Sequence, residues 1–171
     1  MRLDNLSENE HLEIKERCNI NVVTTICAFL NTNGGVLIIG YSERLQKIVG
    51  LKHSDEELFS KAISLIRPDP EQYIKVTREE YQGENYLQVT IHRSSDLHYV
   101  VGYRGNLPIY YFRHNSSDIK MDYERALYHH GIVGSNLPFV KEHEPSDNKE
   151  RFLFRKKLID SSMLNSKYFE H

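Results

Sequence analysis

The sequence predicts an α+β domain in which a mixed, largely antiparallel sheet is packed by two to three helices. Two segments, 21–30 and 55–66, carry apolar residues at helical spacing. Other short segments alternate apolar and polar residues, or are continuously apolar over the length of a strand. Glycine or proline stands between many of these segments, where turns are expected.

The first predicted strand is amphipathic. Leu12 and Ile14 alternate with Glu13 and Lys15, so a strand here directs the apolar pair inward and the charged pair outward together. The two charged side chains are therefore expected on one face.

A buried helix, a tight turn and a buried strand are expected next. The helix 21–30 is apolar over most of its surface. It is expected to end in Asn31-Thr-Asn-Gly-Gly, because Gly34 or Gly35 can take the positive φ of a helix end. The apolar run 36–39 has the length of a buried strand.

The later elements follow from caps, turns and alternation. Ser54 and Glu57 have the spacing of a capping box for a helix that Pro68 and Pro70 end. The turn residues and alternating segments then predict these strands and helix: a hairpin of 36–41 with 48–51, a hairpin of 73–81 with 86–92 around Gly83, a third strand of that group at 98–103, a turn at Gly105-Asn106, a return strand at 107–112 and a short helix at 122–130.

Composition limits the functions to consider. The 171 residues are enough for one domain with its own core, and the net charge of −2 requires that any nucleic-acid binding come from a local basic patch. Two cysteines do not make a disulfide framework or a zinc site. Without a leader-like or membrane-spanning apolar run, a cytoplasmic protein with no membrane partner is expected.

The chain changes character after Gly134. We expect residues 1–134 to form the domain and 135–171 to form a tail. Residues 141–150 are polar and charge-rich, as in a linker, and 152–159 are amphipathic. That amphipathic segment is expected to dock on the domain or on a partner.

Two groups of residues carry a resemblance to a known family. An acidic residue, four spacers and Glu-Ile-Lys precede Ala-Phe-Leu-Asn-Thr-Asn-Gly-Gly-Val-Leu-Ile-Ile-Gly and Ile-Val-Gly-Leu. Later, Tyr-Tyr-Phe-Arg-His-Asn-Ser-Ser begins at Tyr110. Over roughly residues 6–125 these motifs resemble the Schlafen-type, AlbA-like (AlbA_2) domain, so the expected fold is a single Schlafen-core lobe.

The resemblance implies a site. Glu8 and Glu13 fall on two acidic positions that catalytically active family members use, and Glu43 falls on a third, where the family more often has aspartate. Three carboxylates suit a hard cation such as Mg²⁺ or Mn²⁺. Lys15, on the same strand face as Glu13, is placed to touch a scissile phosphate. Since acids are abundant here, a merely solvated charged segment is the alternative reading of the spacing.

The implied function is a metal-dependent endoribonuclease that acts on tRNA-like or other structured RNA. The alternatives are a DNA- or RNA-binding regulatory module without chemistry, and a dimeric scaffold. Family members with a nuclease core pair two lobes into a clamp, so a homodimer, or pairing with another single-lobe protein, is expected.

Basic and aromatic residues near the predicted turns are candidates for contact with the nucleic acid. The basic ones are Lys15, Arg17, Arg44, Lys47, Arg104, Arg113 and Lys120, and the aromatic ones are Tyr110 and Tyr111. The alternative is that they are ordinary solvent-facing charges and sheet tyrosines. Asn31-Thr-Asn-Gly-Gly could be taken for a phosphate cradle, but it ends a helix and lacks a P-loop lysine, so a structural turn is favoured. Asn115 to Ser117 could bind phosphate or cap the next helix.

Overall fold

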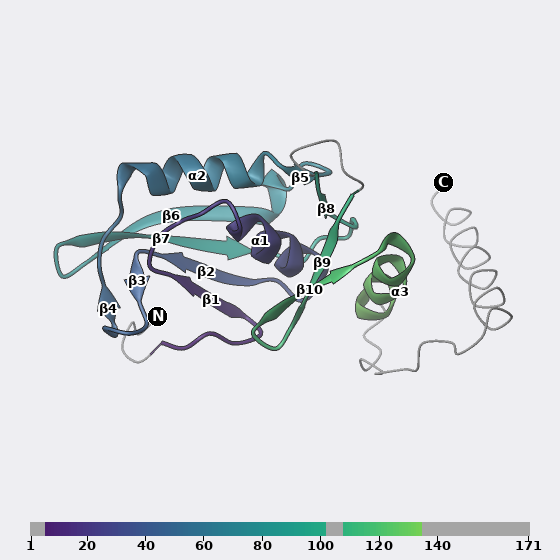
Figure 1. Cartoon of the computed structure of the whole chain (residues 1–171), viewed down its shortest axis with the longest axis horizontal. Coiled ribbons are helices and arrows are strands. Elements are labelled where there is room, and N and C mark those ends of the chain that lie inside the picture. The colour runs from purple at the N-terminus through teal and green to yellow at the C-terminus, as the bar shows by residue number, and fades with distance from the viewer. Residues whose placement is uncertain (1–5, 102–107, 135–171) are drawn as a thin grey trace, which may run out of the picture. The chain divides into compact units, whose positions relative to one another are not determined.

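The computed structural model describes residues 6–101 and 108–134. The chain divides into two units, 1–130 and 131–171, and the fold described here is that of the first. The helices and strands, in chain order, are β1 (Leu12–Lys15), α1 (Val22–Asn31), β2 (Gly35–Ile39), β3 (Tyr41–Ser42), β4 (Lys47–Ile48), α2 (His53–Ile63), β5 (Ile66–Arg67), a 3₁₀ turn (Glu71–Tyr73), β6 (Ile74–Tyr81), β7 (Glu84–Ile91), β8 (Tyr99–Val100), β9 (Tyr110–His114), β10 (Ser117–Met121) and α3 (Tyr123–Gly134) (Figure 1).

The central sheet has four strands in the order β1-β2-β7-β6. β1 runs parallel to β2, and the other pairs are antiparallel, which confirms the predicted α+β fold with a mixed, largely antiparallel sheet. The pairs β3–β4, β5–β8 and β9–β10 form separate two-stranded ladders. None of the helices in the described residues is long and apolar enough to cross a membrane.

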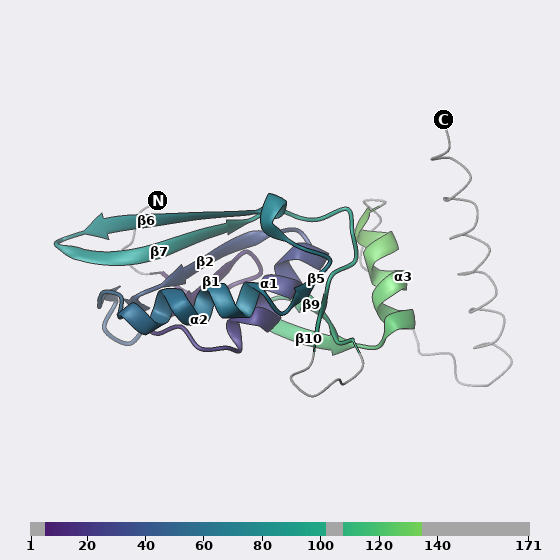
Figure 2. The ribbon, with the colours of Figure 1, turned by 90° about the horizontal axis from the view of Figure 1, so that it is seen from above.

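Both faces of the central strand β2 are covered. Leu37 and Ile39 of β2 face the cluster formed with α1 and α2, whereas Ile38 faces a second cluster with Ile14 and Tyr41. Figure 2 shows α1 and α2 along one side of the sheet. Successive side chains of β2 therefore pack into two different cores, one on each face, which is why the sequence of this strand is continuously apolar.

The turn after α1 is built by two glycines. Gly34 has φ +73°, and a Cβ there would lie 2.5 Å from the carbonyl oxygen of Ile91. A Cβ on Gly35 would lie 2.6 Å from the Phe29 ring. No other residue type fits this turn without displacing the backbone or the core.

α2 begins differently from the prediction. The predicted Ser54–Glu57 capping pair is wrong: the helix begins at His53, and the carboxylate of Asp55 accepts the Lys52 backbone N–H at 2.7 Å. Asp55 is 1% exposed and also accepts the Cys18 N–H at 2.8 Å. This buried aspartate therefore fixes the start of α2 to the segment that follows β1.

The second half of the chain contains two further corrections. The segment from residue 98 does not extend the β6–β7 hairpin, because β8 pairs with β5, where the sequence had predicted the end of α2. Residues 115–117 neither cap α3 nor lie in an open loop. Asn115, with φ +53°, lies in the turn between β9 and the unpredicted strand β10. The predicted turn at 105–106 and the tail from 135 on lie outside the described residues.

Candidate functional site

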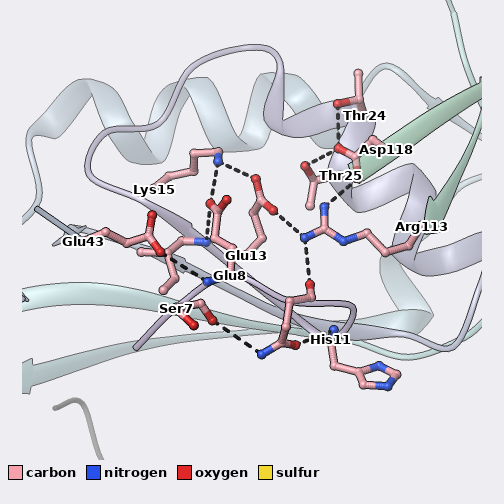
Figure 3. Close-up of polar contacts among 12 residues, drawn as sticks. Ser7, Glu8, His11, Glu13, Lys15, Thr24, Thr25, Glu43, Arg113 and Asp118 are labelled. Atoms are coloured by element: carbon pink, nitrogen blue, oxygen red, sulfur yellow. Dashed lines mark hydrogen bonds and ion pairs between the residues drawn. The ribbon is translucent and has the colours of Figure 1, made fainter. Parts of the chain in front are cut away.

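Two acids from the N-terminal segment and a third from the β3–β4 turn lie beside β1 (Figure 3). Glu43, from the turn between β3 and β4, accepts the backbone N–H of Glu8 at 3.2 Å across 35 residues. Lys15 donates from Nζ to Glu8 Oε1 at 3.0 Å and also pairs with Glu13 Oε1. The predicted acids and the predicted lysine therefore form one connected group, in which the ammonium of Lys15 joins Glu8 to Glu13.

Glu13 is the most enclosed member of this group. It shares a strand face with Lys15, as predicted, but its side chain is only 7% exposed, so the expectation that it points into solvent is wrong. Both of its oxygens are engaged, Oε1 by Lys15 and Oε2 by Arg113 at 2.7 Å. A buried carboxylate is tolerated here because two cations compensate its charge.

Arg113, from β9, holds three acceptors at once. Its guanidinium binds Glu13 Oε2, Asp118 Oδ1 at 2.8 Å and the backbone oxygen of Asn9 at 2.9 Å. It also lies over the Phe29 ring, 5.1 Å from the centroid. Burial alone would lower its pKa, but the hydrogen bonds to Asp118 and Glu13 outweigh burial and raise the pKa. Arg113 therefore stays charged and links β9 to β1.

Asp118 anchors this arginine to the first helix. Its Oδ2 accepts hydrogen bonds from the hydroxyls of Thr25, at 2.7 Å, and Thr24, at 3.2 Å. Its Oδ1 accepts from Arg113. A chain of alternating charges thus runs from the start of α1 through Asp118, Arg113, Glu13 and Lys15 to Glu8 (Figure 3). We call these five ionised side chains, with Glu43, the charge chain.

Lys15 is the cation of the charge chain that reaches solvent. Its side chain is 31% exposed. Burial alone would lower its pKa, but hydrogen bonds to Glu13 and Glu8 and their negative charges raise it above the ordinary lysine value. The ammonium is therefore charged at neutral pH, and it is in a position to exchange its carboxylate partners for another anion.

The three acids are the right type of ligand for a hard divalent cation, but their carboxylates are not arranged around a common point. Carboxylate oxygens are the ligands that Mg²⁺ and Mn²⁺ prefer. Within 6–101 and 108–134, however, no three His, Cys, Asp or Glu side chains are grouped closely enough to hold an ion. The reason is visible in the contacts, because Lys15 and Arg113 occupy the oxygens of Glu13 and Lys15 occupies Glu8 Oε1.

The geometry can be compared with known proteins. The family model described as Schlafen, AlbA_2 matches residues 8–122, which is more than half of the chain and spans the whole charge chain. This chain belongs to the Schlafen AlbA_2 family. No curated protein matches it.

Two solved structures resemble this Schlafen AlbA_2 domain. The crystal structure of the DIP2311 protein from Corynebacterium diphtheriae matches with a TM-score of 0.52 and 14% identity, over 70% of this chain and 23% of that one. The solution structure of the N-terminal domain of a RecG-related protein from Nitrosomonas europaea matches with a TM-score of 0.45 and 20% identity, over 84% and 92%. The present chain thus corresponds to under a quarter of the first protein, and that likeness shows the fold alone.

Some of the residues predicted to contact nucleic acid are exposed to solvent, and others are engaged within the protein. Arg44 is exposed next to Glu43 in the β3–β4 turn, Lys47 is exposed at the start of β4, and Lys120 is exposed on β10. With Lys15 they offer positive charge to a phosphate backbone. Arg104 lies outside the described residues.

The other candidates are engaged within the protein. The Arg113 side chain is 1% exposed and pairs with Glu13 and Asp118, so its guanidinium faces the protein interior. Tyr110 is 7% exposed, which leaves no ring face for stacking, and Tyr111 is half-buried against the main core. Arg17 donates to the Gly50 oxygen at 2.5 Å and lies 3.6 Å from Asp55, so it mainly ties the β1–α1 segment to α2.

Sequence reasoning missed three polar residues that position the site. The amide of Asn31 is 0% exposed and binds His98 N, His98 O and Tyr111 O. Thr32 accepts the backbone N–H of Arg113 at 2.9 Å and thereby fixes the strand that carries the guanidinium. The third is Asp118, which no spacing in the sequence had marked. The turn motif is therefore structural, as favoured over a phosphate cradle, and it also aligns β9 with α1.

Proposed function

We propose that this Schlafen AlbA_2 domain binds and cleaves structured RNA of the tRNA-like class at the charge chain. The observation that carries the proposal is the meeting of Glu8, Glu13, Glu43 and Lys15, which come from three separate segments of the chain. Family membership supports a role in nucleic-acid binding or cleavage. The substrate class and the cleavage step are our inference.

The proposed first step is an exchange of partners at Lys15. The lysine is charged and partly exposed, and a phosphate of the bound RNA competes with Glu8 and Glu13 for its ammonium. Lys15 then neutralises charge on the phosphodiester, and the released carboxylate oxygens face the substrate. Arg113 stays in place, because its side chain is buried, and keeps Glu13 oriented during the exchange.

Cleavage in this proposal also depends on Mg²⁺ or Mn²⁺. Glu8, Glu13 and Glu43 are the residues that would hold the ion after Lys15 withdraws, and the ion would supply Lewis-acid stabilisation of the phosphodiester charge. Two consequences follow. Divalent-ion affinity is expected to be low for the free protein, and Lys15→Met is expected to bind Mn²⁺ more tightly than the wild-type protein without any RNA.

The surface beside the acids supports binding of the backbone. Arg44, next to Glu43 in the β3–β4 turn, and Lys47, the first residue of β4, are exposed. Because the Glu43 carboxylate accepts the backbone N–H of Glu8, we infer that RNA held by these two cations also meets the charge chain. Since the net charge of the chain is −2, binding depends on this local patch and is expected to weaken steeply with salt.

The second candidate is a DNA- or RNA-binding regulatory module without chemistry. The observation in its favour is that Lys15 and Arg113 already neutralise Glu13, a stable state that needs no ion. In this reading the charge chain is a structural element and only the basic turn acts on nucleic acid.

The experiment that separates the two candidates uses total tRNA and a DNA duplex with Mg²⁺ or Mn²⁺. The variants are Glu13→Gln, Glu43→Gln and Lys15→Met, with Glu10→Gln as the matched control because Glu10 is an exposed neighbour. Circular dichroism confirms that each variant is folded. Cleavage that is lost in the three site variants and kept in Glu10→Gln supports the nuclease.

Two other outcomes have defined meanings. A shift of tRNA or DNA without cleavage, weakened in a double Arg44→Ala, Lys47→Ala variant and unchanged in Lys61→Ala, supports the binding module. Intact RNA with no shift of either nucleic acid overturns both and leaves a protein scaffold.

A further inference from the structure

The edge of the central sheet farthest from the site is a long open strand. β6 has eight residues and pairs only with β7 among the described strands. Most of its side chains are exposed, and Val76 is 45% exposed. Figure 2 shows β6 as the outermost strand of the sheet. Such an edge presents a row of backbone donors and acceptors that a further strand can pair with.

The hydrogen-bonding pattern between β6 and β7 shows which backbone groups of β6 are left without a partner in the described sheet. His92 donates its backbone N–H to Tyr73 at 2.8 Å, just before the pair Ile74–Ile91. Bonded and non-bonded pairs alternate in an antiparallel ladder, so every second residue points its N–H and C=O away from β7. These outward residues are Ile74, Val76, Arg78 and Glu80.

We propose that two copies of this chain pair through β6, antiparallel, about a two-fold axis that passes beside Thr77. In this register Val76 lies opposite Arg78 of the other copy, and Ile74 lies opposite Glu80. The outward backbone groups of one strand therefore meet those of the other, and the two sheets become one continuous sheet.

The charges along β6 match this register. Lys75 lies opposite Glu79 of the other copy, and the symmetry repeats the pair, so two ion pairs flank the central Thr77–Thr77 contact. Opposite charges and threonine pairs directly across two strands are stabilising. The opposite face is compatible as well, because Arg78, which pairs with Glu56 of α2 at 3.2 Å, lies over the exposed Val76 of the other copy.

Pairing registers shifted by two residues from this one are less favourable. A slip of two residues in one direction places Arg78 opposite itself, and like charges in that position are destabilising. A slip in the other direction places Lys75 opposite Thr77 and forms no ion pair. Charged edge strands usually prevent pairing, whereas these charges permit pairing with a second copy in one register.

This pairing is independent of the proposed RNA cleavage. β6 and β1 are the two opposite edges of the sheet, so a dimer formed through β6 leaves the charge chain uncovered. The dimer can be tested on full-length protein without RNA or metal ions.

The test is a charge exchange followed by light scattering coupled to gel filtration, over about 1 to 100 µM protein. The wild-type protein is expected to be a dimer. Lys75→Glu and Glu79→Lys should each weaken the dimer by about tenfold or more, because each turns two attractive pairs into repulsive ones. An equimolar mixture of the two variants should dimerise again, since both facing pairs are then complementary in the mixed dimer. The double variant should also recover.

The control is Lys61→Glu, the same charge change on the exposed face of α2, which should leave the dimer unchanged. A wild-type protein that is monomeric over the whole range overturns the proposal. So does a dimer that neither single variant weakens, or that the mixture fails to restore. Val76→Pro removes one outward N–H and keeps the ladder with β7, and it should weaken the dimer without unfolding the domain.

Discussion

The turn at Asn31–Gly35 and the charge chain both adjoin α1, and they illustrate two uses of polar residues. The turn is uncharged, and Asn31 and Thr32 bind backbone groups of His98, Tyr111 and Arg113. The charge chain is ionised, and Lys15, which joins Glu13 to Glu8, remains 31% exposed. The turn therefore supports the fold, whereas the charge chain holds a partly exposed cation between two acids. The most specific sequence signal of the family belongs to the turn and so identifies architecture, not chemistry.

The largest expected effect comes from breaking the charge chain at its buried centre. Arg113→Met leaves Glu13 and Asp118 without their shared cation, and removal of one partner from a buried ion pair typically costs about 3–5 kcal/mol. We expect a loss of that size in the free energy of unfolding from urea denaturation. A loss below about 1 kcal/mol would show that the chain contributes little to stability.

The next effect comes from breaking the turn. Asn31→Leu leaves the backbone groups of His98 and the oxygen of Tyr111 unsatisfied in the interior. Each such group costs roughly 1–3 kcal/mol, so we expect a loss of about 3 kcal/mol. Asn33→Ala is the matched control, because Asn33 is the exposed asparagine of the same turn, and it should change stability by less than about 0.5 kcal/mol. Equal losses in the two variants would contradict this assignment.

An intermediate effect is expected from pH. His98 is buried and bonds Pro68 O and Ser94 Oγ, and burial lowers its pKa in the folded state. Burial lowers the pKa of His129 and His130 as well. The unfolded state then binds more protons, so stability is full above the ordinary histidine pKa of about 6.5 and falls as the pH drops below it.

The measurement is the urea midpoint between pH 7.5 and pH 5. Each such histidine can contribute at most about 1.4 kcal/mol per pH unit. His98→Gln should reduce the slope, whereas His92→Gln, at an exposed position, should leave it unchanged. A midpoint that does not vary with pH would show that these histidines do not resist protonation in the folded state.

The smallest effect on stability is expected from the exposed end of the charge chain. Lys15→Met removes a partly solvated cation and should cost about 1 kcal/mol or less, because water compensates the carboxylates. Its effect on ligands should be larger, with weaker tRNA binding and tighter Mn²⁺ binding by calorimetry. A stability loss as large as that of Arg113→Met would mean that Lys15 is a structural residue and not an exchangeable one.

Much of the fold could be predicted from local patterns. The strand at 12–15, the first helix, the Gly34 turn and the hairpin around Gly83 depend on residues close together in the chain, and each was found close to its predicted position. The pairing of β8 with β5, and the strand β10, depend on distant partners, and no local periodicity indicates them.

The site shows the same division. The family resemblance placed Glu8, Glu13, Glu43 and Lys15, and the structure brings them together. Burial was not predictable, because Glu13 has the sequence environment of a surface acid. Glu13 is buried because Arg113, which is 100 residues later in the chain, packs against its carboxylate. Without the β9–β10 pairing, nothing in the sequence relates Asp118 to this arginine.

The alternating charges of this chain constrain how the protein can evolve. Loss of a buried residue of the charge chain leaves the opposite charge beside it without a partner. Single substitutions at Glu13, Arg113 or Asp118 should therefore be rare among relatives, and simultaneous replacement of both partners should be common. A homologue that lacks the arginine should also have lost one of the two acids, or have gained another cation within reach. The Glu43 carboxylate accepts the backbone N–H of Glu8 and compensates no buried charge, so this position should vary more freely, including to the shorter aspartate.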